Sequence, residues 1–128
     1  MNPYLAAASA LCVVGALIHS VLGERLIFGP LFKGELPKLQ GSEAFMKQVL
    51  RAFWHGFSIF LAGIATVLIS AATVDPLEGS GRWMIGIIQW TVLIPLALYV
   101  LIQTRGKHFA WVLFALASIL IWLGLNAV

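Results

Sequence analysis

Four long segments of the chain contain no Asp, Glu, Lys or Arg. They are Met1–Gly23, Ala52–Val74, Trp83–Thr104 and His108–Val128. An α-helix of about 20 residues spans the ~30 Å hydrocarbon core of a bilayer, and it satisfies its own backbone hydrogen bonds there. These segments therefore predict an all-α integral membrane protein with four transmembrane helices.

The composition agrees with this prediction, because 61% of the 128 residues are hydrophobic and only 10% are charged. Soluble domains carry about 25% charged residues, so this chain has too few to cover a water-facing surface. We expect one transmembrane domain over residues 1–128, with helices at about 4–23, 43–74, 83–104 and 108–127 and a cytoplasmic loop at 24–42. The other connections are short, which predicts an up-down-up-down antiparallel bundle.

The basic residues are distributed unevenly, and their placement predicts the topology. Seven of the eight Lys and Arg residues lie in or beside the first and third loops; they are Arg25, Lys33, Lys38, Lys47, Arg51, Arg105 and Lys107. Cytoplasmic loops are enriched in Lys and Arg, so both termini are expected outside and loops 1 and 3 inside. The net charge of +3 is then a topology signal, and the lipid bilayer, not nucleic acid, is the expected partner.

Local signals refine the helix boundaries. Pro30 lies in the first loop and argues against a continuous helix there. Ser42 is a candidate N-cap for the second helix, and Glu43 and Lys47 are spaced to pair at i,i+4. Pro95 predicts a kink in the third helix, one turn before it.

The histidines all lie at the expected cytoplasmic side of the membrane. His19 comes just before Glu24, where the first helix leaves the bilayer, and His55 comes just after Arg51, where the second helix enters it. At 1.5 Å per residue both histidines lie ~6–8 Å inside the boundary. His108 stands at the same boundary in the third loop. An ionisable residue within the membrane is by default a candidate functional residue.

Two histidines that face each other across antiparallel helices can axially ligate a haem b. Gly15 and Gly23 stand one helical turn to either side of His19 and would leave room for a flat macrocycle. Arg51 or Arg105 could pair with the propionates. The axial ligands and their burial would then tune the haem.

Other interpretations of the same residues stay open. With Glu24 or His108 added, His19 and His55 could hold a divalent transition metal, since imidazole suits zinc, copper, iron and nickel. The histidines could also relay protons, because histidine titrates near neutral pH. In a purely structural role, each ring would only hydrogen-bond a carbonyl or a lipid headgroup.

Three classes of function follow. The first is a haem- or metal-binding module, for example in electron transfer. The second is a non-catalytic accessory or assembly subunit that docks a membrane partner or a second copy of itself. The third is a small permease or proton-linked carrier. The sequence contains no Ser-His-Asp set, phosphate-binding glycine loop, CxxC or HExxH motif, so nothing in it supports enzyme activity.

The segments HSVLGERLIFGPLF (residues 19–32) and LRAFWHGFS (residues 50–58) resemble an uncharacterised group of small bacterial four-helix inner-membrane proteins. The resemblance covers the first two helices and their connection. It implies a bacterial inner-membrane location, and it implies no activity and no site residues.

Overall fold

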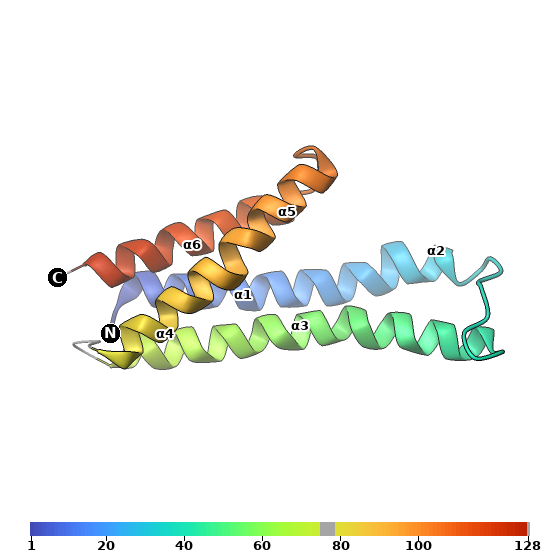
Figure 1. Ribbon diagram of the computed structural model, residues 1–128, viewed down its shortest axis with the longest axis horizontal. Coiled ribbons are helices and arrows are strands. Elements are labelled where there is room, and N and C mark those ends of the chain that lie inside the picture. The colour runs from blue at the N-terminus through green and yellow to red at the C-terminus, as the bar shows by residue number, and fades with distance from the viewer. Residues whose placement is uncertain (75–78, 128) are drawn as a thin grey trace.

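The computed structural model describes residues 1–74 and 79–127, and these residues form four helical rods. The rods contain, in order, α1 (Pro3–Leu22) with η1 (Gly23–Phe28) and α2 (Gly29–Leu31); α3 (Glu43–Thr73); α4 (Ser80–Ile88) with η2 (Gln89–Leu93) and α5 (Ile94–Thr104); and α6 (Ala110–Asn126). Consecutive rods run in opposite directions, and both termini lie at the end of the molecule where α4 begins (Figure 1). The chain is therefore an all-α helical bundle, as predicted.

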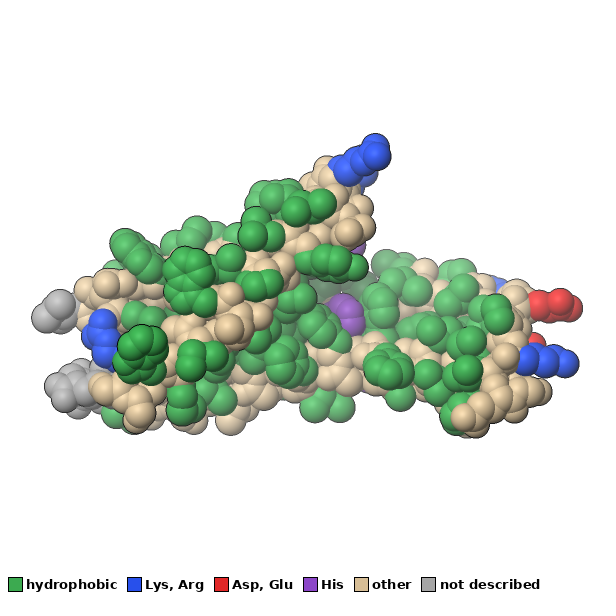
Figure 2. All heavy atoms as spheres, viewed as in Figure 1, with side chains coloured by type: hydrophobic (Ala, Val, Ile, Leu, Met, Phe, Trp, Pro, Cys, Tyr) green, Lys and Arg blue, Asp and Glu red, His purple; other side chains and the backbone are tan. Residues whose placement is uncertain are grey.

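Three of the rods are long and apolar enough to cross a membrane, namely Pro3–Leu31, Glu43–Thr73 and Ser80–Thr104, while α6 is a shorter apolar helix. Large apolar side chains on the outside are strongly exposed, with Trp83 at 76% and Phe53 at 80%. Hydrophobic side chains cover most of the face in Figure 2, and charged side chains gather at its ends. Such a surface is suited to lipid, so the chain is a multi-pass membrane protein.

The core lies where α1 packs between α3 and α6. Small residues such as Ala8 and Cys12 are fully buried there, which allows the helix backbones to approach closely. Leu61, Leu68 and Ile121 fill the remaining space. The third rod packs mainly through α5 on α6, and the first rod and α3 extend past the tip between α5 and α6 (Figure 1).

The first rod continues to Leu31, where the sequence predicts a loop from residue 24. The turn over Gly23–Phe28 is π-helical, and the Gly29 N–H donates to the Glu24 carbonyl, five residues back. A proline inside an α-helix clashes with the carbonyl four residues before it. The widened turn directly before Pro30 relieves that clash, and the helix ends one residue after the proline. The predicted loop 24–42 is thus helical in its first part.

The same arrangement precedes Pro95. The π-helical turn η2 spans Gln89–Leu93, and the Ile94 N–H donates to the Gln89 carbonyl. The Thr91 hydroxyl donates to the Ile87 carbonyl at 2.7 Å, so a side chain compensates for the changed backbone pattern. The break in the α-helical pattern lies where Pro95 predicts it.

The start of α3 also follows its sequence signals. The Ser42 hydroxyl accepts a hydrogen bond from the Phe45 N–H at 3.2 Å, which confirms the predicted N-cap. Lys47 pairs with Glu43 at 2.7 Å, which confirms the predicted i,i+4 ion pair.

Candidate functional site

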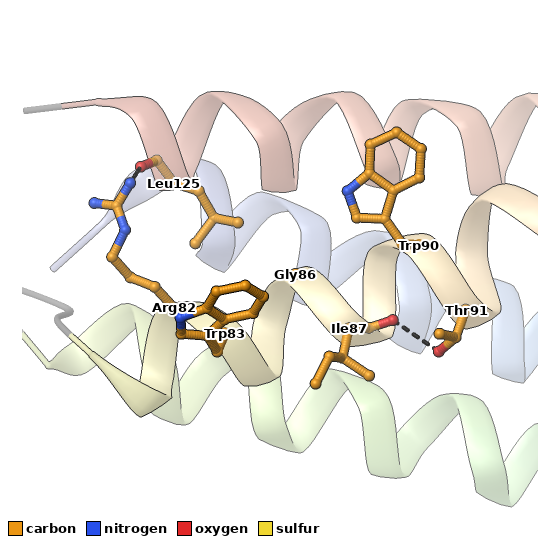
Figure 3. Close-up of a pocket in the computed structure, with 7 residues that line it drawn as sticks. All are labelled: Arg82, Trp83, Gly86, Ile87, Trp90, Thr91 and Leu125. Carbon is orange, nitrogen blue, oxygen red and sulfur yellow. Dashed lines mark hydrogen bonds between the residues drawn. The ribbon is translucent and has the colours of Figure 1, made fainter.

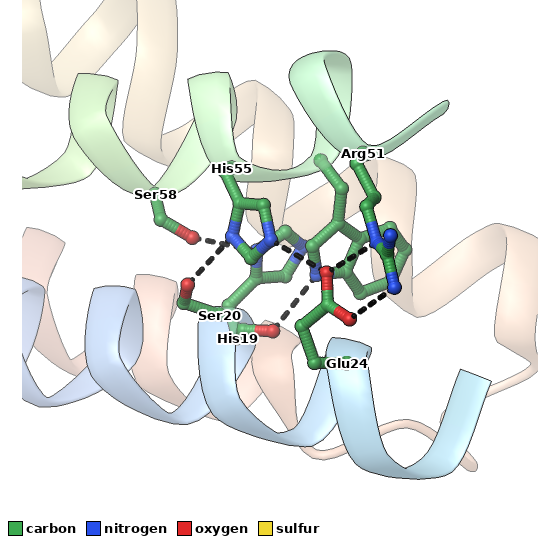
Figure 4. A network of polar contacts seen from close by, with 7 residues as sticks. His19, Ser20, Glu24, Arg51, His55 and Ser58 are labelled. Carbon is green, nitrogen blue, oxygen red and sulfur yellow. Dashed lines mark hydrogen bonds and ion pairs between the residues drawn. The ribbon is translucent and has the colours of Figure 1, made fainter. Parts of the chain in front are cut away.

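Polar side chains of the first rod and α3 meet where the two helices lie side by side (Figure 4). The first rod contributes His19, Ser20 and Glu24, and α3 contributes Arg51, Trp54, His55 and Ser58. The helical spacing explains the arrangement, because residues three and four apart share one helix face. The structure therefore brings together four residues predicted for the site, namely His19, Glu24, Arg51 and His55. We call this group, with Ser20 and Ser58, the α1–α3 polar network.

Glu24 is the centre of this network. Its carboxylate accepts two hydrogen bonds from the Arg51 guanidinium, from Nε at 2.9 Å and from Nη2 at 3.1 Å. Its Oε1 also lies 3.0 Å from Nε2 of His55. A bidentate pair of this kind fixes geometry as well as charge. The boundary residues of two helices are thus tied together through one carboxylate.

Both ring nitrogens of His55 have hydrogen-bond partners within the network. The carboxylate of Glu24 is paired with Arg51 and can only accept, so Nε2 of His55 carries the proton toward it. In the neutral ring, Nδ1 is then an acceptor, and the Ser20 hydroxyl, 2.7 Å away, donates to it. Neither ring nitrogen of His55 remains open to a ligand in this arrangement.

His19 is held differently. Its Nδ1 lies 3.0 Å from the hydroxyl of buried Ser58, and its Nε2 has no hydrogen bond to the described residues. The ring stacks on Trp54 at a centroid distance of 4.2 Å and an angle of 7°, and the edge of Phe57 packs against it at 5.1 Å. When Nδ1–H donates to Ser58, the lone pair of Nε2 is free.

Trp54 fills the space beside Gly23. A Cβ atom at Gly23 would overlap the indole, and the indole Nε1–H donates to the His19 carbonyl at 2.8 Å. At Gly15 a Cβ would lie 3.2 Å from the side chain of Leu113. The glycines therefore serve close helix packing, and the clearance that the sequence suggested for a macrocycle between the two histidines is occupied by protein.

His108 stands apart from the network. It lies in the exposed connection between α5 and α6, where its Nδ1 accepts a hydrogen bond from the Ala110 N–H at 3.1 Å. Within residues 1–74 and 79–127, no group of three or more His, Cys, Asp or Glu side chains could hold a metal ion. Figure 2 shows a notch between the tip of α5 and the side of the first rod, with a histidine side chain on its floor.

Ser20, His55 and Glu24 follow one another in the order of a catalytic triad, with contacts of 2.7 and 3.0 Å. Acyl transfer also needs N–H donors aimed at the developing oxyanion. Ser20 lies inside α1, where backbone N–H groups donate to the carbonyls of the helix itself. Among the described residues these three groups therefore form an oriented hydrogen-bond chain, and the backbone N–H groups beside Ser20 are used within the helix.

Few buried polar residues lie outside the network in the part of the chain that the structure describes. Its buried polar residues outside the network are Ser9, Gln89 and Ser118. Ser9 donates to the Ala65 carbonyl, Gln89 to that of Ser118, and Ser118 to that of Phe114. Each of these buried donor groups is thus satisfied by a backbone carbonyl.

Comparison of the chain with protein-family models, with curated proteins and with solved structures gives no match.

Proposed function

We propose that this multi-pass membrane protein binds haem b through His19, near the cytoplasmic face of the bilayer. One observation carries the proposal. Of the two intramembrane histidines, only His19 retains a ring nitrogen without a hydrogen bond to the described residues, while its other nitrogen is held by Ser58. Histidine ligands in metalloproteins are oriented in this way by a hydrogen bond at the second nitrogen.

The donor set favours haem over a bare metal ion. A bare divalent ion takes three or more protein ligands, and the described residues offer no such group. Haem would bring its own four nitrogen ligands, so a single protein side chain, that of His19, could hold it. The aromatic side chains around His19 and the lipid beyond it suit an apolar macrocycle.

Basic side chains outside the α1–α3 polar network could bind the propionates. Arg105 and Lys107 are exposed in the connection between α5 and α6 and would be available to the propionates. Arg51 is already paired with Glu24, so it is the weaker candidate of the two arginines suggested by the sequence. Bound haem would supply a one-electron carrier at this side of the membrane.

The test is a titration of the purified protein in mild detergent with haem b, followed at the Soret band. We expect saturation at one haem per chain and loss of the band in His19→Ala. The matched control is Ser70→Ala, exposed near the other end of α3, which should bind as the wild type does. Ser58→Ala should weaken binding about 10- to 100-fold, the usual effect of losing the orienting partner of a histidine ligand.

Two results would overturn the proposal. Wild-type protein that stays colourless throughout the titration would exclude a haem site. Equal binding by the wild type and by His19→Ala would place any haem elsewhere.

A second candidate, an accessory subunit of a larger membrane complex, is favoured by the ends of the first rod and α3 that extend past the α5–α6 tip. Apolar side chains there are exposed, with Leu26 at 66% and Phe53 at 80%. Purification from native membranes with one stoichiometric partner, lost in Leu26→Ala/Phe53→Ala, would support this role. Recovery of the chain alone after chemical cross-linking would count against it.

A further inference from the structure

A groove of about 460 Å³ lies between the third rod and α6, away from the α1–α3 polar network. Its lining includes Gln89, Trp90, Ala97, Ser118, Ile119 and Trp122. A neighbouring groove shares Trp90 and leads toward Arg82 and Leu125, whose carbonyl accepts a hydrogen bond from Arg82 (Figure 3). The volume falls within the ~300–1,000 Å³ that is usual for small-molecule sites.

Gln89 sets the chemistry of the groove. Its side chain comes from the first position of η2 and is only 5% exposed. The amide Nε2 donates to the Ser118 carbonyl at 2.9 Å. Because a carbonyl can only accept, the nitrogen must face Ser118, and Oε1 points to a different side.

The Oε1 atom of Gln89 has no hydrogen bond to the described residues. Among those residues, every fully inaccessible side-chain nitrogen or oxygen has a partner. The unbonded Oε1 must therefore be one of the few accessible atoms of Gln89, and Gln89 lines the groove. An acceptor without a donor is costly in hydrocarbon, because no water is present to satisfy it.

The walls of the groove are aromatic and apolar. Trp90 is 69% exposed and Trp122 is 58% exposed, so their indoles are available to a ligand. Indole faces pack well against flat, rigid apolar bodies and cost little conformational entropy. The π-helical turn that positions Gln89 is a feature found frequently at functional sites.

We propose that this groove binds a flat polycyclic alcohol from the bilayer. Its hydroxyl donates to Oε1 of Gln89, and its ring system lies between Trp90 and Trp122. The hydroxyl gives Oε1 of Gln89 a hydrogen-bond donor, and the apolar body replaces lipid chains along α5 and α6. This site is independent of haem binding at His19.

The experiment uses the full-length protein in phosphatidylcholine nanodiscs and a diazirine-bearing cholesterol probe, with the cross-linked peptides identified by mass spectrometry. We expect labelling concentrated on the third rod and α6 around Gln89. Unlabelled cholesterol should compete, whereas cholest-5-ene, which lacks the hydroxyl, and a straight-chain alcohol should not.

Gln89→Leu should lower labelling about 10-fold, in line with loss of a hydrogen bond in a water-free site. The matched control is Gln103→Leu, on the same rod and exposed, which should label as the wild type does. Trp122→Ala alters an exposed wall without touching the core, and it should also lower labelling. Equal competition by cholest-5-ene or by the straight-chain alcohol would overturn the proposal, as would labelling spread evenly over the lipid-facing surface.

Discussion

Among single residues, Gly23 is the position where the packing most strictly requires the absence of a side chain. A Cβ atom there would overlap the indole of Trp54, which donates to the His19 carbonyl and stacks on the His19 ring. We expect Gly23→Ala to lower the free energy of unfolding by ~1–3 kcal/mol, the usual cost of overpacking. Thermal unfolding in detergent measures the change.

The control for this prediction is Gly56→Ala on α3, because a Cβ at Gly56 has nothing within 4 Å. It should leave the unfolding midpoint unchanged or raise it slightly, since alanine has the higher helix propensity. Equal losses in the two variants would show that the contact between Gly23 and Trp54 has no special role.

Only some residues of the α1–α3 polar network could be predicted from the sequence. Depth along the helices correctly places His19, His55, Glu24 and Arg51 in one region. Ser20 could not be predicted, because its partnership depends on how two rods are rotated about their axes. The role of Trp54 could not be predicted either, because its indole turns inward only where Gly23 on the facing helix leaves room for it.

At the scale of elements, Glu24 ties two helices together, whereas Glu43 pairs only within its own helix. We expect Glu24→Gln to lower the unfolding midpoint, because both Arg51 and His55 lose a charged acceptor. Glu43→Gln should leave the midpoint almost unchanged, since exposed i,i+4 pairs contribute little. Differential scanning fluorimetry of the two variants compares them, and a larger loss in Glu43→Gln would contradict the assignment.

The rods themselves were mostly predictable, because length, apolarity and the Ser42 cap set their positions. The extension of the first rod to Leu31 was not, since a proline normally argues against a helix. Propensity alone does not reveal that a π-helical turn can precede Pro30 and accommodate its ring. Pro95 predicts the position of the break in the third helix. It does not predict that the break is a π-helical turn.

For the whole molecule, the charge distribution predicts which end faces the cytoplasm. In a Cys12→Ala background, Lys33→Cys and Lys107→Cys should react with a membrane-impermeant maleimide only from the cytoplasmic side. Arg82→Cys, at the end that holds both termini, should react only from outside. The opposite pattern in sealed vesicles would reverse the topology and move His19 to the outer side.

In the proposed haem site His19 alone, and not the pair of His19 and His55, would hold the haem. Electron paramagnetic resonance of the haem-loaded ferric protein tests it directly, because a ferric haem held by one histidine would be high-spin and one held by two histidines would be low-spin. We predict a high-spin signal in the wild type that persists in His55→Gln and disappears in His19→Ala. A low-spin signal that is lost in His55→Gln would instead show that both histidines hold the haem.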